Sequence, residues 1–263
     1  MSEVINQPGG ALALPNDVMA ALAAEAKAAA ANERPSTGRI SLKSGQMTYG
    51  GAPIAGNKME VLILSAAYRN VWYAGRYDAN NVVNPNCFSL ADTDADMVPH
   101  INVREKPAAA CGACPHNEWG SDPNGGRGKA CKQSRRLVLL PATALKDGRE
   151  GILGAEMAVM DLPVTSVKNY STFINTLAAS ANVPPYAAVT EVSVVPNAKT
   201  QFQVQFRPLR VVGTMEELNA VRSRLDAART LSLEPYEDTA VMADEEEQTP
   251  APAAAAAKKA KKF

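Results

Sequence analysis

The chain has 263 residues, of which 46% are hydrophobic and 21% are charged, so it is long and apolar enough to bury a core. Lys and Arg number 27 together, as do Asp and Glu, and the formal net charge is zero. No apolar run reaches the roughly 18 residues of a membrane-spanning helix, and the Ala-rich N-terminal stretch lacks the basic region and cleavage site of a signal peptide. We therefore expect neither a membrane protein nor a secreted one.

Residues 1–36 are predicted to form a flexible N-terminal arm. They are rich in Ala, Gly, Pro and Asn, and they allow one short helix from Asp17 to about Ala30, between Pro15 and Pro35. The apolar side of that helix is mostly Ala, which offers little surface for packing against a core.

The core is predicted to span residues 37–233 and to be mainly β with two helices, an α+β fold whose leading shape is a small OB-like barrel. Strands do not alternate with helices as they would in a doubly wound α/β fold. Strand-like patterns cover residues 40–42, 46–49, 61–68, 136–140, 157–162, 189–195 and 201–212. Helical patterns cover residues 166–181 and 215–231.

Two local signals within this core are specific. The strands at 189–195 and 201–206 are separated by a short Pro-Asn-containing turn, which predicts a hairpin. In its second strand Phe202, Val204 and Phe206 share one face, and glutamines occupy the other. Thr214 and Glu217 form a capping-box pattern at the start of the second helix.

The four cysteines are the most informative feature. Cys87, Cys111, Cys114 and Cys131 have the spacing C-x23-C-x2-C-x16-C, in which the central pair forms a knuckle and the outer two complete a tetrahedron. Four thiolates favour Zn²⁺ in a closed structural site. The Gly- and Pro-rich loop at 115–130 has few apolar residues, so we expect one zinc ion per chain to hold it in place.

Other roles for these cysteines remain open at this stage. Disulfides, a thioredoxin-like pair at Cys111 and Cys114, and buried thiols without a ligand are the three alternatives. His116, two residues beyond the knuckle, is an alternative fourth ligand. With four thiols present we interpret His116, like His100, as a residue outside the ligand set.

Cations and aromatic residues cluster around the cysteines. Residues 104–136 contain seven Lys or Arg against three acidic residues, and a segment at 68–77 interleaves aromatic rings with arginines. Cations neutralise phosphates and rings stack on bases, so both segments are predicted to bind nucleic acid. A solvated loop and half-buried rings are the simpler alternatives. The candidate contacts are Tyr68, Arg69, Trp72, Tyr73, Arg76, Tyr77, Lys106, Trp119, Arg127, Lys129, Lys132 and Arg135.

No recognisable catalytic motif is present. The sequence lacks G-x-S-x-G, H-E-x-x-H and a Walker motif, because Ala130 follows Gly128-Lys129 where Ser or Thr is required. We therefore expect no enzymatic activity.

Residues 234–263 are predicted to be a disordered tail. Seven acidic residues and no Lys or Arg lie between Glu234 and Glu247, and four lysines and the terminal Phe263 follow a Pro- and Ala-rich stretch. Glu245, Glu246, Glu247 and Phe263 are the candidate partner-binding residues.

The sequence also resembles a family of tailed-bacteriophage proteins that are regarded as single-stranded DNA-binding proteins. The resemblance rests on C-x-x-C-P-x-N-x-W/F-G-S at 111–121, G-K-A/G-C-K at 128–132 and R-R-L at 135–137, and it extends over about residues 37–230. It implies an oligonucleotide-binding barrel with a four-cysteine zinc site, a role in phage replication and no catalytic activity. It also implies that an acidic tail ending in Phe recruits replication proteins, although here lysines separate the acidic residues from Phe263.

These observations predict a non-enzymatic zinc protein that coats single-stranded DNA during phage replication, recombination or repair, in the cytoplasm of the infected host and with self-association on DNA. The first alternative is a zinc-containing transcription accessory factor that binds RNA polymerase. A purely architectural zinc protein and a metalloenzyme are the others. An intact four-thiolate site would exclude zinc-centred catalysis.

Overall fold

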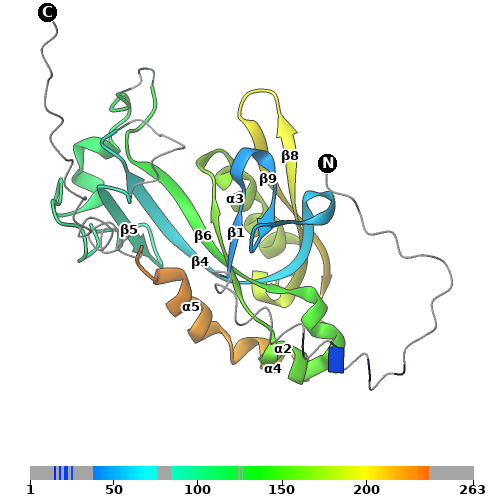
Figure 1. Cartoon of the computed structure of the whole chain (residues 1–263). Helices are drawn as coiled ribbons and strands as arrows, with labels where there is room; N and C mark the ends of the chain where they lie inside the picture. The colour runs from blue at the N-terminus through cyan, green and yellow to red at the C-terminus, as the bar shows by residue number, and fades with distance from the viewer. Residues whose placement is uncertain are drawn as a thin grey trace, which may run out of the picture.

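The computed structural model describes residues 38–75, 84–123, 125 and 127–236, with five separate positions nearer the N-terminus, Pro15, Val18, Ala21, Leu22 and Glu25. Within these residues a nine-stranded sheet curls into a half-barrel, and helices pack against it (Figure 1). The fold is therefore mainly β, as the sequence predicts. The strands are β1 Arg39–Ser41, β2 Thr48–Tyr49, β3 Ala52–Pro53, β4 Lys58–Trp72, β5 Cys87–Ala91, β6 Lys132–Pro141, β7 Ala158–Leu162, β8 Ala188–Asn197 and β9 Gln201–Val211.

Strand β4 organises the sheet. The strand order is β3-β2-β1-β7-β6-β4-β8-β9, and β5 pairs with β4 beside this path. One edge of β4 pairs with β6 through residues 61–71. The opposite edge pairs with β8 through residues 58–61 and then with β5 through residues 68–72. This 15-residue strand therefore connects the part of the sheet beside β8 with the part beside β5.

Apolar side chains are buried on both faces of the sheet. Val61 and Ile63 of β4 contribute to one core cluster, which also contains Phe173 of the helix α3 (Val167–Thr176). The alternate residues Leu62 and Leu64 belong to a second cluster on the other face, with residues of the C-terminal helices. Because both faces are covered, the central strands are continuous apolar runs rather than alternating ones.

All seven predicted strands are confirmed, with shifted ends, and two further strands were not predicted. The hairpin is β8–β9, with Asn197 opposite Gln201, and Phe202 and Phe206 pack against the core that buries Val204. Strand β3 is only two residues long. Strand β5 begins at Cys87, and its short, mixed sequence has no period that would distinguish it from a loop.

The prediction of two helices was wrong in number. Helix α3 and the π-helical turn after it, Leu177–Ala181, confirm the first. The second is divided into α4 (Met215–Arg222) and α5 (Leu225–Leu233), and α4 begins with the predicted capping box of Thr214 and Glu217. An additional helix, α2 (Gly148–Gly154), was not predicted, since three of its seven residues are Gly, a poor helix former.

Tertiary contacts hold these helices in place. At the interruption between α4 and α5, the Arg224 guanidinium donates hydrogen bonds to the carbonyls of Ile152, Leu153 and Ala155, at the C-terminal end of α2. A Cβ on Gly151 would lie 2.4 Å from the Ala144 carbonyl oxygen. Helix α2 thus needs glycine for its close packing.

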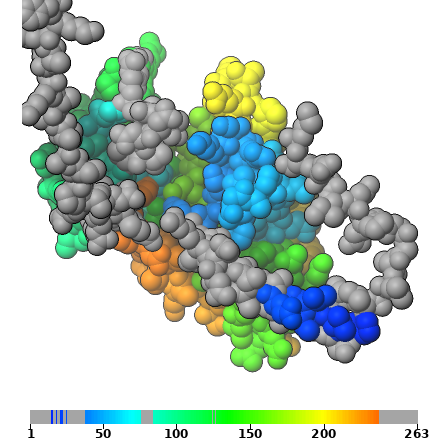
Figure 2. Space-filling view, viewed as in Figure 1, coloured from blue at the N-terminus to red at the C-terminus, as the bar shows by residue number. Residues whose placement is uncertain are grey.

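The β8–β9 hairpin contacts the turns beside the N-terminal strands at one end of the molecule, while the teal-to-green segment that carries the cysteines lies at the left of the view (Figure 2). The contact is tight at Gly45, where an added Cβ would lie 3.3 Å from Cβ of Phe202. The predicted N-terminal helix falls largely outside the described residues. No helix in the described part of the chain combines the length and apolar character needed to cross a bilayer.

Candidate metal centre and nucleic-acid interface

The fold brings the four cysteines to one cavity. Cys87 begins β5 and is paired with Trp72 at the end of β4, and Cys131 directly precedes β6. Cys111 and Cys114 flank a tight turn that is closed by the Cys114 amide, which donates to the Cys111 carbonyl at 3.4 Å. All four thiols are free, all are buried, and all line the same cavity.

Backbone hydrogen bonds fix the cysteine segments to one another. The Cys131 amide donates to the His116 carbonyl at 2.7 Å, and the Cys111 amide donates to the Met97 carbonyl at 3.1 Å. Gly120 has a φ of +88°, a conformation that favours glycine, and its amide donates to the Gly128 carbonyl at 2.9 Å. The loop that carries Trp119 is thus closed upon itself.

The thiols affect one another electrostatically. Burial, together with Cys111 and Cys114, raises the pKa of Cys87 to about 11. Burial and the other three cysteines raise the pKa of Cys131 to about 12. Nearby cations oppose this rise: Lys106 lowers the pKa of Cys87, and Lys129 lowers the pKa of Cys131. Gathering four thiolates here would be costly without a cation, and a dication removes that cost.

The donor set of the cavity fits a thiophilic metal ion. The side-chain amide nitrogen of Asn70, buried in the cavity wall, has no hydrogen-bond partner among the described residues, and such a donor suits a thiolate sulfur. In the described part of the chain, however, no three His, Cys, Asp or Glu side chains form a ready-made metal-binding group. The sulfur atoms would have to draw together to hold an ion.

His116 also lines the cavity, but its ring has another contact. It stacks on Trp72 with 3.9 Å between ring centroids and 12° between planes. His100 stacks on Phe88 at 4.8 Å, and burial together with Lys106 lowers its pKa.

Four of the predicted nucleic-acid contacts form a continuous row, which we call the aromatic–cationic row: Trp119, Lys129, Arg135 and Tyr68. Lys129 Nζ lies 5.2 Å from the ring centroid of Trp119, and it also donates to Gln133 Oε1 at 3.2 Å. Gln133 and Arg135, two residues apart on β6, share one face of the sheet. The Arg135 guanidinium carbon lies 3.5 Å from the ring centroid of Tyr68, its cross-strand neighbour on β4.

The two ends of this row differ in exposure. Trp119 is 79% exposed, whereas Tyr68 is partly buried and packs against Cys111 and Met97. Arg135 and Tyr68 also lie near Tyr170 of α3, whose pKa burial raises. The row therefore runs from the exposed loop beside the cysteines along the sheet toward α3.

The other predicted nucleic-acid contacts differ in exposure and in their partners. Tyr73, Lys106 and Arg127 are exposed, and Lys132 Nζ is bound to Asp122 at 2.6 Å. Trp72 is covered by His116. Arg76 and Tyr77 lie outside the described residues, as do Glu245, Glu246, Glu247 and Phe263.

Arg69 lies apart from the other predicted contacts. Its side chain is only 13% exposed, and it points into a network of polar groups instead of toward solvent. Its Nε donates to the Tyr236 hydroxyl at 2.7 Å and its Nη1 donates to Ser134 Oγ at 2.9 Å. Arg69 therefore lies in this network and outside the aromatic–cationic row.

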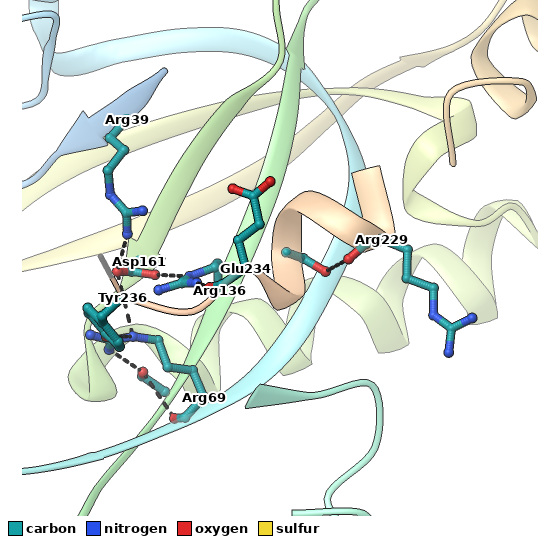
Figure 3. A network of polar contacts seen from close by, with 9 residues as sticks. Arg39, Arg69, Arg136, Asp161, Arg229, Glu234 and Tyr236 are labelled. Carbon is teal, nitrogen blue, oxygen red and sulfur yellow. Dashed lines mark hydrogen bonds and ion pairs between the residues drawn. The ribbon is translucent and has the colours of Figure 1, made fainter. Parts of the chain in front are cut away.

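The sequence did not predict this network, which also contains Arg39, Arg136 and Asp161 (Figure 3). Tyr236 lies three residues beyond the predicted end of the core, so the packed chain extends past the boundary at 233. The one available signal was the isolated Tyr236 between Pro235 and an acidic run, and this does not identify its partners.

Comparison of the chain with protein-family models, with curated proteins and with solved structures finds no match.

Proposed function

We propose that this protein binds single-stranded DNA and coats it, without catalytic activity, in bacteriophage replication, recombination or repair. The observation that carries the proposal is the aromatic–cationic row. It combines rings, which stack on bases, at its two ends with cations, which neutralise phosphates, between them, and single-strand binding uses both.

The spacing within the row supports this role. A nucleic-acid strand offers a base and a phosphate at each step, and the Trp119–Lys129 pair presents one ring and one cation on an exposed loop. Lys129 is held by Asn117 Oδ1 at 3.1 Å as well as by Gln133, so its position is fixed before a ligand arrives. A pre-positioned cation loses less side-chain entropy on binding.

In this proposal one Zn²⁺ is bound by Cys87, Cys111, Cys114 and Cys131. When bound, the ion would crosslink the thiolates and neutralise part of their charge. Cys131 precedes β6 by one residue, and Cys111 and Cys114 precede the loop with Trp119. The crosslink would therefore hold the exposed end of the row against the sheet.

The curled sheet is compatible with an OB-like barrel, in which single strands lie across the sheet face. The resemblance of the cysteine region to phage proteins favours the cytoplasm of the infected host as the place of action. On the same basis, we propose that the acidic residues and Phe263 recruit a replication protein, and that the protein self-associates on DNA.

The test is a salt titration of binding to single-stranded DNA, duplex DNA and RNA of one length, with the full chain and with a Lys129→Ala/Arg135→Ala variant. The full chain should prefer single-stranded DNA. The double variant should lower the slope of log K against log salt by about 0.7 for each lost phosphate contact.

Arg207→Ala is the matched control, because this exposed arginine on β9 pairs with Glu191 and not with a residue of the row. It should leave both affinity and slope unchanged. Equal binding by the double variant and the wild type at every salt concentration would refute the proposed interface. Stable binding to RNA polymerase with only weak, strongly salt-sensitive DNA binding would instead support a transcription accessory factor.

A further inference from the structure

Three arginines converge on one carboxylate beneath the end of α5 (Figure 3). Asp161 of β7 accepts hydrogen bonds from Arg39 at 2.8 Å and from Arg136 at 2.9 Å, and Arg69 Nε lies 3.6 Å from it. The arginines come from β1, β4 and β6. The sheet therefore builds this arginine cluster, Arg39, Arg69 and Arg136 with Asp161, from four different strands.

The positive charge of the cluster exceeds its negative charge. Three guanidinium groups face one carboxylate, and Asp161 is the only acidic side chain paired with them among the described residues. The Arg136 side chain is 1% exposed, yet its Nη2 has no hydrogen-bond partner in the described part of the chain. A buried, unpartnered cationic donor beside further cations is the feature of an anion site.

Neutral groups of the residues after α5 cover this cluster. Arg136 Nη1 donates to the Glu234 carbonyl at 2.5 Å, and the Tyr236 hydroxyl accepts from Arg69 Nε. The Tyr236 ring lies over both guanidinium groups, with its centroid 5.6 Å from Arg69 and 5.3 Å from Arg136. A carbonyl and a phenol supply oxygen acceptors without supplying the missing negative charge.

Beyond the arginines, Tyr236 packs against the apolar cluster around Phe88. Its ring meets Phe88 edge to face at 5.0 Å, and the residue itself is partly buried. Arg39, at the edge of the cluster, is 43% exposed. Moving the 234–236 segment outward would expose the cluster to solvent without unpairing a strand.

We propose that the arginine cluster is a binding site for a phosphate group and that Tyr236 covers it. The phosphate oxygens would replace the Tyr236 hydroxyl and the Glu234 carbonyl as acceptors and would pair with the guanidinium forks, including the free donor of Arg136. The source is a free phosphate ion or the backbone of a nucleic acid. The inference stands on this cluster alone and does not rest on the proposed function.

The experiment measures binding of inorganic phosphate by calorimetry, at constant ionic strength, to the full chain and to Tyr236→Ala. The variant should bind phosphate more tightly than the wild type by about tenfold or more, the gain expected when one covering hydrogen bond to a charged group is removed. Tyr236→Phe removes only the hydroxyl and should show a smaller gain. If Tyr236→Ala does not fold, Tyr236→Phe alone decides, and no gain there overturns the proposal.

Adding Arg39→Ala to Tyr236→Ala should abolish the gain, whereas adding Arg207→Ala, an exposed arginine in a separate ion pair, should preserve it. Unchanged phosphate affinity in Tyr236→Ala, or a gain that survives Arg39→Ala, would overturn the proposal. A second arm uses a short single-stranded oligonucleotide. A parallel gain there identifies a nucleic-acid backbone as the source, and a gain for inorganic phosphate alone identifies the free ion. Failure of the wild type to bind DNA at all would refute only the proposed function.

Discussion

The indole of Trp72 and the imidazole of His116 stack nearly parallel, with their ring centroids 3.9 Å apart. Trp72 ends the longest strand of the sheet, and His116 follows the knuckle by two residues. This pair is therefore a direct contact between the sheet and the cysteine loop. Because Trp72 is fluorescent, its emission can be used to follow the position of the loop.

Zinc content is the first prediction. The protein should contain one Zn²⁺ per chain, and Cys114→Ser should lose it and unfold the 111–131 loop locally. A structural zinc site contributes on the order of 10 kcal/mol, which the few apolar residues of this loop cannot replace. Elemental analysis of the purified chain measures the metal. Well under one equivalent in the wild type would contradict the prediction.

Removal of the metal should also change the surroundings of Trp72. The chain has two tryptophans, so Trp119→Phe leaves Trp72 as the sole indole. In that variant a chelator should shift and alter Trp72 emission as the stack with His116 opens. Emission that is the same before and after complete metal removal would show that the loop holds its position without zinc.

Trp119 is predicted to stack on a base. Trp119→Ala should weaken single-strand binding by roughly 1–3 kcal/mol and leave the salt slope nearly unchanged, because a ring carries no charge. The side chain is 79% exposed, so its loss should not alter the thermal midpoint. Trp119→Tyr is the matched control and should recover much of the affinity. An unchanged affinity in the alanine variant would remove Trp119 from the interface.

Asp161 should stabilise the fold in a pH-dependent way. Burial alone would raise the pKa of Asp161, but Arg69, Arg136 and Arg39 outweigh it and hold the pKa below its ordinary value. A depressed folded-state pKa gives stability that is present above the unfolded-state value of about 4 and is lost as pH falls through the lower folded-state value. Asp161→Asn should therefore cost about 3–5 kcal/mol at pH 7, since it leaves Arg136 buried and unpaired.

The measurement is denaturant unfolding of the wild type and Asp161→Asn at pH 7, 5 and 3. The difference between them should shrink below about pH 4. Glu191→Gln is the matched control, because its partners Arg207 and Lys58 are exposed, and it should change stability by at most about 1 kcal/mol. A constant difference at all three pH values would contradict the assignment.

Two truncations should behave differently. Removing residues 237–263 should leave stability nearly unchanged and tighten single-strand binding at low salt, since the tail then offers no carboxylates to compete with phosphates. Removing residues 234–263 should in addition destabilise the fold, because it deletes the contacts of Glu234 and Tyr236 with the arginine cluster. Thermal melts and oligonucleotide titrations measure the two effects. Equal melting of both truncated chains would contradict this role of Tyr236.

The sequence predicted those parts of the fold that have a strong local pattern. The short Pro-Asn-containing turn between two strand patterns predicted the β8–β9 hairpin, and Thr214 and Glu217 predicted the start of α4. Helix α2 was missed because glycine is a poor helix former, yet Gly151 is needed for packing against Ala144, a tertiary requirement that overrides helix propensity.

The candidate site likewise has parts with a local sequence pattern and parts that depend on tertiary contacts. Cysteine spacing predicted that the four thiols would lie together, and all four line one cavity, while zinc binding stays a prediction. The arginine cluster was not predictable, because the sequence around an arginine does not show whether its side chain lies on the surface or in a buried network. Arg135 and Arg136 are adjacent in sequence but point to opposite faces of β6, one toward Tyr68 and the other toward Asp161.

The shared strand β4 has a consequence for the exchange of backbone amide hydrogens. Residues 68–71 are paired on both edges, with β5 and β6, while residues 62–67 are paired only with β6 among the described strands. We therefore expect the half of β4 beside β8 and the half beside β5 to open separately. Exchange should be slowest where each half is doubly paired, and loss of metal should accelerate it at Asn70 and Val71 while leaving Val61 protected.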